Sequence, residues 1–148
     1  MSDGLRALAS VASAKEDESA RAHADVLRAE ERARASWQDA LERLAEAERV
    51  LRAADDTGMS AAERVGAEAH RAKLRERVVA AKQLASSRQL VHERAAGAVE
   101  ASRASLGIAH GEHRMVRDRL ERQDGLVRAS RARREDDETD DLAGRKRD

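Results

Sequence analysis

The chain has 148 residues, enough for one domain, of which 39% are charged and only 1% aromatic. Its 29 basic and 29 acidic side chains balance, which argues against a dedicated nucleic-acid-binding protein, and the absence of cysteine excludes disulfides and thiol chemistry. Ala, Leu, Arg and Glu dominate, a composition typical of long helices and coiled coils. No signal peptide and no apolar run of membrane-spanning length is found, so we expect a soluble cytoplasmic protein.

The first element that we expect is a helix over residues 5–54, a stretch without proline or another helix breaker. Acid-first charge pairs four residues apart, such as Glu30 with Arg34, support it. The heptad repeat of this helix is imperfect, because Arg34 and Glu48 occupy positions in the same row along the helix as its apolar residues. The apolar side is wide and rich in alanine, and it consists of Leu5, Leu8, Val11, Ala20, Leu27, Trp37, Leu41, Leu44 and Leu51.

Residues 55–59 form a predicted corner between two helices. Gly58 suits a helix end because it enters the left-handed conformation without a Cβ clash. Ser60 and Glu63 have the S-x-x-E spacing of a capping box, in which each side chain satisfies a free backbone N–H group at a helix start. The stretch therefore predicts a helix stop followed by a new helix.

The second predicted helix covers residues 60–143 and carries a regular apolar seam. Alternating steps of four and three follow one heptad register, the repeat that supports left-handed supercoiling. This seam consists of Leu74, Val78, Ala81, Ala85, Arg88, His92, Ala95, Val99, Ser102, Leu106, Ala109, His113, Val116, Leu120, Gln123 and Val127.

Two helices separated by a stop-start signal predict an all-α antiparallel coiled-coil hairpin that forms a single domain over residues 1–148. Folding about Thr57 places apolar residues opposite one another: Leu41 near Leu74, Trp37 near Val78, and Leu8 near Leu106. A kinked continuous rod that dimerises is the alternative.

The two predicted arms are unequal, at about 75 Å and about 125 Å for a rise of about 1.5 Å per residue. The first arm is expected to run out near residue 109, which leaves an overhang of the second helix from about residue 110. An apolar seam without a partner in its own chain is a candidate surface for another protein. Pairing with a second copy, or fraying, is the plainer alternative. The candidate contact residues are Val116, Leu120, Leu126 and Val127.

Catalytic and cofactor-binding motifs are not found, and we expect neither an enzyme nor a bound cofactor or metal. The sequence contains no phosphate-binding glycine loop and no nucleophile or zinc-protease motif. His110 and His113 lie one helical turn apart, but no further ligand has suitable spacing, so His113 is expected to pack in the seam. The basic residues 128–134 and the acidic residues 135–141 predict a solvated helix end or a charged tip bound by a partner.

The order and spacing of several short motifs resemble the flagellar export protein FliJ family and, more remotely, the stalk proteins of type III secretion injectisomes. The resemblance lies in Leu5-x-x-Leu8 followed by Lys15-Glu16, in the corner residues 56–61, in residues 120–123, and in the acidic, apolar and basic finish of residues 140–145. It covers nearly the whole chain, including the layout of a shorter first and a longer second helix.

The resemblance implies a non-catalytic stalk at the cytoplasmic face of the inner membrane. Such a protein inserts into the flagellar export ATPase hexamer, promotes its assembly, links it to the cytoplasmic domain of the membrane export gate, and handles export chaperones. It binds no nucleic acid and reaches the membrane only through partners. The family's gate-binding surface matches Leu74, Val78 and Ala81 in this sequence. The same residues lie on the seam expected to face the first helix, so we favour packing within the chain for Val78 and leave Leu74 and Ala81 open.

Two alternatives to this function remain open. One is the stalk of a non-flagellar type III system. The other is a self-associating structural coiled coil without an ATPase partner, which predicts a concentration-dependent dimer, whereas a stalk predicts a monomer that binds a ring. A helical export chaperone is disfavoured because the seam is narrow.

Overall fold

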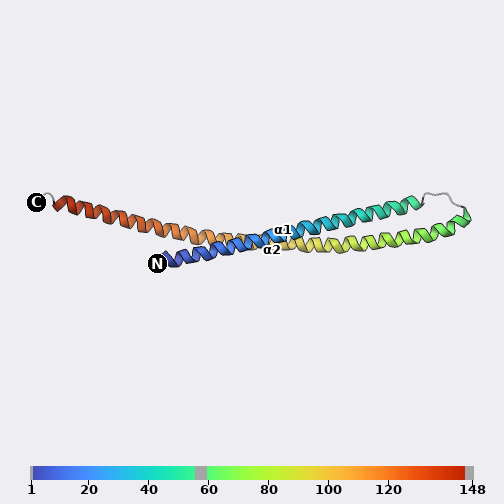
Figure 1. Cartoon of the computed structure of the whole chain (residues 1–148), viewed down its shortest axis with the longest axis horizontal. Helices are drawn as coiled ribbons and strands as arrows, with labels where there is room; N and C mark the ends of the chain where they lie inside the picture. Colours follow the sequence, from blue (N-terminus) through green and yellow to red (C-terminus); the bar gives the residue numbers. More distant parts are fainter. Residues whose placement is uncertain (1, 56–59, 146–148) are drawn as a thin grey trace. The chain divides into compact units, whose positions relative to one another are not determined.

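The fold is all-α, as the sequence predicts. A computed structural model describes residues 2–55 and 60–145, and within them all side chains except those of residues 2, 55, 61–64, 137 and 139–145. Helix α1 covers Ser2–Asp55 and helix α2 covers Ala61–Arg145 (Figure 1). The predicted bounds, 5–54 and 60–143, differ from these by at most three residues. Ser60 stands directly before α2, at its N-cap position, whereas Gly58 and the side chain of Glu63 lie outside the described part.

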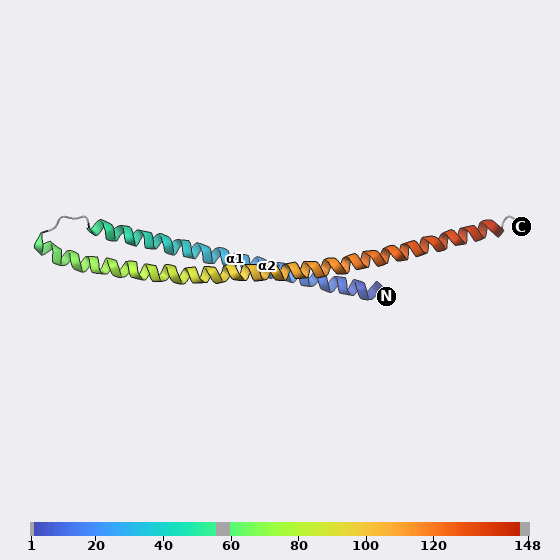
Figure 2. The same cartoon turned by 180° about the vertical axis from the view of Figure 1, so that it is seen from behind.

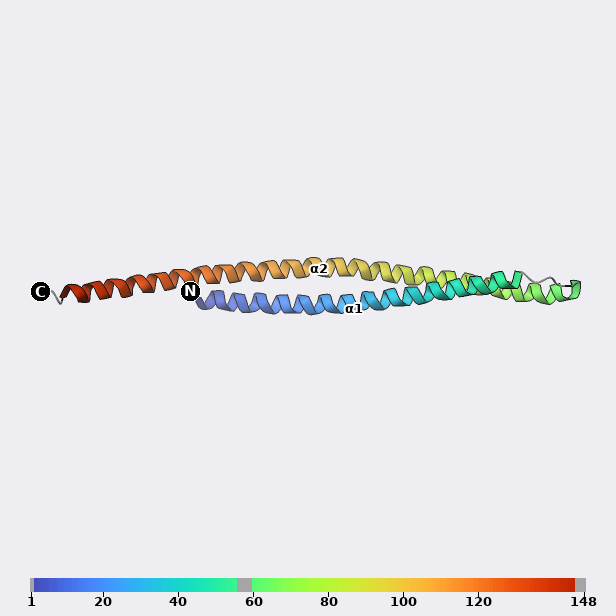
Figure 3. The ribbon, with the colours of Figure 1, turned by 90° about the horizontal axis from the view of Figure 1, so that it is seen from above.

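The chain divides into two compact units, and both helices contribute to each. Unit 1 contains Met1–Ala22 and Arg103–Asp148, and unit 2 contains His23–Ser102. Within each unit the α1 and α2 segments run antiparallel and lie side by side, as the views from behind and from above show (Figure 2, Figure 3). The hairpin arrangement is therefore present in both units.

The seam predicted on α2 is confirmed. Of its sixteen positions, only Arg88 and Val127 are exposed, and the others are buried or half-buried. The most completely buried side chains of the described residues lie on the seams of the two helices: Ala40, Leu74, Val78, Ala85 and Ala109. Three of these five are alanines, and such small side chains let two helices approach closely.

The apolar side predicted for α1 is partly wrong. Leu8, Val11, Leu27 and Leu41 are 40–66% exposed. Instead, every position of a strict four-three repeat from Leu5 to Ala54 is half-buried or buried, and neither Arg34 nor Glu48 belongs to it. This α1 seam consists of Leu5, Ala9, Ala12, Glu16, Ser19, His23, Val26, Glu30, Ala33, Trp37, Ala40, Leu44, Ala47, Leu51 and Ala54. A few positions beside the repeat, such as Glu48 and Val50, are half-buried as well.

The pairing register in unit 2 also differs from the prediction. Trp37 stacks on His92 rather than lying near Val78, and Glu48 pairs with Lys82, which leaves Leu41 away from Leu74. The shift is close to two heptads, and every seven-residue shift keeps both seams facing each other. Periodicity alone therefore could not select the register.

A contact at the end of α1 shows which residues of α2 extend beyond α1. The Nε and Nη2 groups of Arg71 donate to the carbonyl oxygen of Ala54 at 3.2 and 3.1 Å, and so satisfy a carbonyl that lacks a partner in its own helix. Because Arg71 lies opposite Ala54, the first turns of α2 extend past the last residues of α1. Val65, which lies in these turns, is 74% exposed.

Candidate functional site

The register shift changes the position of the predicted overhang in unit 1. Leu106 lines a hollow together with Glu16 and Ala20 rather than lying opposite Leu8. Arg6, near the start of α1, lines another hollow with α2 residues between Asp124 and Arg131. Helix α1 therefore reaches about fifteen residues further along α2 than the sequence predicted, and an overhang from residue 110 is wrong.

The four predicted ATPase contacts separate into two pairs. Val116 and Leu120 are half-buried on the seam of unit 1, so they belong to the interface between α1 and α2. Leu126 is 72% exposed and Val127 is 43% exposed. All described side chains from 125 to 138 are exposed, and α2 continues to Arg145. We call residues 125–145 the α2 tail; α1 reaches only its start, at the hollow that Arg6 lines with Arg128 and Arg131.

The predicted export-gate residues lie inside the hairpin of unit 2. Leu74 is 3% exposed, Val78 is 7% exposed, and Ala81 is half-buried. Their side chains contact α1, since they occupy successive seam positions of α2. The burial of Val78 agrees with the packing within the chain that the sequence favours for it, and Leu74, which the sequence left open, is buried as well. Neither side chain is available to a partner while the two helices remain packed.

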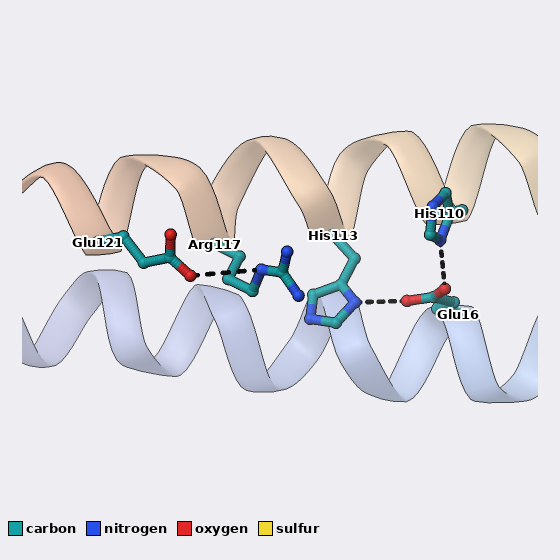
Figure 4. Close-up of polar contacts among 5 residues, drawn as sticks. All are labelled: Glu16, His110, His113, Arg117 and Glu121. Carbon is teal, nitrogen blue, oxygen red and sulfur yellow. Dashed lines mark hydrogen bonds and ion pairs between the residues drawn. The ribbon is translucent and has the colours of Figure 1, made fainter.

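A polar bridge at the unit 1 seam joins the two helices (Figure 4). Both histidines donate from Nδ1 to the carboxylate of Glu16: His110 at 2.7 Å to Oε1, and His113 to Oε2. Beside them, Lys15 Nζ pairs with Glu112 Oε2 at 2.6 Å. We call Glu16, His110 and His113 the histidine bridge.

The histidine bridge changes the acidity of its carboxylate. Hydrogen bonds from His110 and then His113 lower the pKa of Glu16 below its ordinary value of 4.5, and burial opposes this only in part. His113 occupies the seam, as the sequence predicts, but it acts as a hydrogen-bond donor across the seam. Sequence reasoning missed Glu16, although its place in the four-three repeat of α1 would have revealed it.

Histidines bridge the seam of unit 2 as well. The ring of His92 stacks on Trp37 with centroids 5.3 Å apart, and its Nδ1 lies 3.4 Å from Glu30 Oε1. Further along, His23 Nδ1 lies 2.8 Å from the hydroxyl of Ser102, which itself donates to the Val99 carbonyl. The contacts of His92 with Trp37 and Glu30, and of His23 with Ser102, join α1 to α2, so polar groups help to fix which residues face each other.

Two surface hollows of unit 1 lie on the side of the seam that carries His110. One, of about 550 Å³, forms where Ala20 and Gly107 supply little side-chain volume, and acidic, basic and apolar residues line it together. The other, of about 290 Å³, lies at the start of the α2 tail, where Arg6, Arg128 and Arg131 surround Val127 and Asp124. The second hollow offers three guanidinium groups to an acidic partner.

Neither helix contains, among its described residues, a segment that is long and apolar enough to cross a membrane. The described residues also include no cluster of three or more His, Cys, Asp or Glu side chains arranged to hold a metal ion.

Compared with known proteins, the chain matches no protein-family model, no curated protein sequence and no solved structure. The function has to be inferred from the residues and their arrangement.

Proposed function

We propose that the chain is a stalk protein of the flagellar type III export apparatus. In this role it works without catalysis at the cytoplasmic face of the inner membrane, inserts into the ring of the export ATPase and promotes assembly of that ring. It connects the ring to the export gate and also handles export chaperones. The resemblance of the sequence motifs supports the proposal, and so does the antiparallel pairing of two long helices.

The observation that carries the proposal is the α2 tail. In unit 1, α1 covers α2 only as far as the hollow at Arg128 and Arg131, and α2 then continues to Arg145. A stalk that enters a ring needs such a projecting helix. Leu126, which is 72% exposed, is a large apolar side chain at this point, and together with Val127 it supports the proposal of a partner contact here.

The test is a titration of the protein into the export ATPase of the same organism, with ATP turnover and oligomeric mass followed together. We expect turnover and the hexamer population to rise together and to saturate near one chain per ring. Leu126→Asp should lose this stimulation. The matched control is Leu90→Asp, because Leu90 is also well exposed but lies in unit 2.

Unchanged turnover and unchanged mass on addition of the wild-type chain would refute the proposal. If the chain alone also formed dimers at micromolar concentration, a self-associating structural coiled coil would be indicated. Stimulation that survives Leu126→Asp would leave a stalk function but move its contact away from the α2 tail.

A further inference from the structure

The α2 tail and the residue before it carry a charge pattern that reverses about a midpoint. Residues at equal distances on either side of the bond between Arg134 and Glu135 carry opposite charges. On one side of the helix this holds at four steps, and one apolar residue matches another; Arg133 and Asp136 match as well but lie on the opposite side. The matched residues are Arg134 and Glu135, Arg131 and Glu138, Arg128 and Asp141, Asp124 and Arg145, and the apolar pair Val127 and Leu142.

These matched positions share one side of a single helix. They follow one another in steps of three and one, so each lies three or four residues from another member, and together they share one broad side of the helix. Helix α2 runs without interruption through all of them. Asp124 is half-buried, and the described members beyond it, from Val127 to Glu138, are exposed. We call this side the charged face.

We propose that the charged face pairs with the same face of a second copy of this chain, in an antiparallel two-fold arrangement. A two-fold axis at the midpoint places the basic half of one tail against the acidic half of the other, and each opposite-charge pair then occurs twice. A parallel pairing would set Arg against Arg and acid against acid, which is repulsive. The charge pattern therefore selects both the partner and the direction.

The structure strengthens the basic half beyond what α2 supplies. Arg6 of α1 lies at the same hollow as Arg128 and Arg131, next to the apolar surface of Val127. Among the described residues that line this hollow, Asp124 is the only acidic one. The partner's acidic half thus meets three guanidinium groups, which pair readily with carboxylates.

Contacts within one helix compete with this pairing. Glu135 already interacts within its own chain, so the pairing does not rest on it. The outer pairs, Arg131 with Glu138 and Arg128 with Asp141, carry the specificity. Exposed ion pairs contribute little each, so we expect a weak dimer with a dissociation constant on the order of 0.1–1 mM at low salt. This is far weaker than the micromolar dimer expected of a structural rod, and it leaves monomer available to an ATPase ring.

A charge-swap experiment on the full chain tests the pairing. One variant carries Arg128→Glu and Arg131→Glu, and the other carries Glu138→Arg and Asp141→Arg. Each variant alone places like charges opposite one another and should weaken the dimer at least about tenfold. An equimolar mixture restores opposite charges at all four positions and should recover the dimer. Sedimentation velocity at millimolar protein measures the mass, and circular dichroism confirms that every variant keeps its helix content.

The matched control is Arg122→Glu with Arg133→Glu, which makes the same change of net charge on the opposite side of the helix. This variant should dimerise like the wild type, and raising NaCl from about 0.05 M to about 0.5 M should dissociate the wild-type dimer. A monomeric wild type at low salt overturns the proposal, as does a mixture of the swap variants that stays monomeric. The result does not depend on ATPase stimulation, so the pairing and the stalk function can fail separately.

Discussion

Truncating Leu74 to alanine tests the pairing of the two helices in unit 2 directly. Leu74 is the largest side chain among the five buried ones, with Val78 the next, and it is only 3% exposed. Leu41, which the sequence placed opposite it, is 41% exposed. The same Leu→Ala change at the two positions therefore removes the same atoms from very different surroundings.

The expected cost follows from burial and from the cavity left behind. Leu→Ala in a closed core costs about 2–5 kcal/mol, because the cavity adds to the lost transfer free energy. A two-helix seam is open at its sides and can relax, so we expect about 2–3 kcal/mol for Leu74→Ala, near the value of about 1.5–3 kcal/mol for burying a leucine. Leu41→Ala leaves no closed cavity and should cost less than about 1 kcal/mol.

Urea unfolding followed by circular dichroism at 222 nm measures both changes, and thermal unfolding gives an independent check. At about 2–4 °C per kcal/mol for a chain of this size, Leu74→Ala should lower the melting temperature by roughly 5–10 °C. Equal costs at the two positions would refute the register described above, because they would mean that Leu41 is as buried as Leu74.

Three further predictions concern unit 1. Glu16→Gln should reduce the loss of folding stability at acid pH. In the wild type, the lowered pKa of Glu16 contributes stability that is fully present above its ordinary pKa of 4.5 and is lost as the pH falls through the lower pKa of the folded state. Urea midpoints between pH 3 and pH 6 measure this, and Glu18→Gln, at a neighbouring exposed position, should keep the wild-type slope. Gly107→Ala should raise the free energy of unfolding by about 0.5–1 kcal/mol, because the added Cβ meets no atom within 4 Å. A variant less stable than the wild type would contradict the helical packing described at this position. Leu120→Asp should reduce the helix content because Leu120 is half-buried on the seam, whereas Leu126→Asp should leave it unchanged because Leu126 is exposed. Circular dichroism measures both variants. A larger loss of helix for Leu126→Asp would contradict the extent to which α1 covers α2.

The sequence determined the class of the fold and the limits of its elements. The absence of proline, the abundance of helix-forming residues and the stop-start signal at residues 55–60 predict two helices, because these signals act through local backbone preferences. The α2 seam was also determined locally, since its heptad repeat has one unbroken phase. For α1 the repeat is interrupted by Glu16, Glu30 and His23, so its apolar residues alone gave the wrong face.

Only the tertiary structure decided which residues of α1 meet which residues of α2. A heptad repeat is unchanged by a shift of seven residues, so periodicity permits several registers that differ in their individual contacts. Specific contacts distinguish them: Trp37 on His92, Arg71 on the last turn of α1, and Glu16 between two histidines. Because the register fixes where α1 stops covering α2, it also decided that Val116 and Leu120 are partly covered while Leu126 remains exposed.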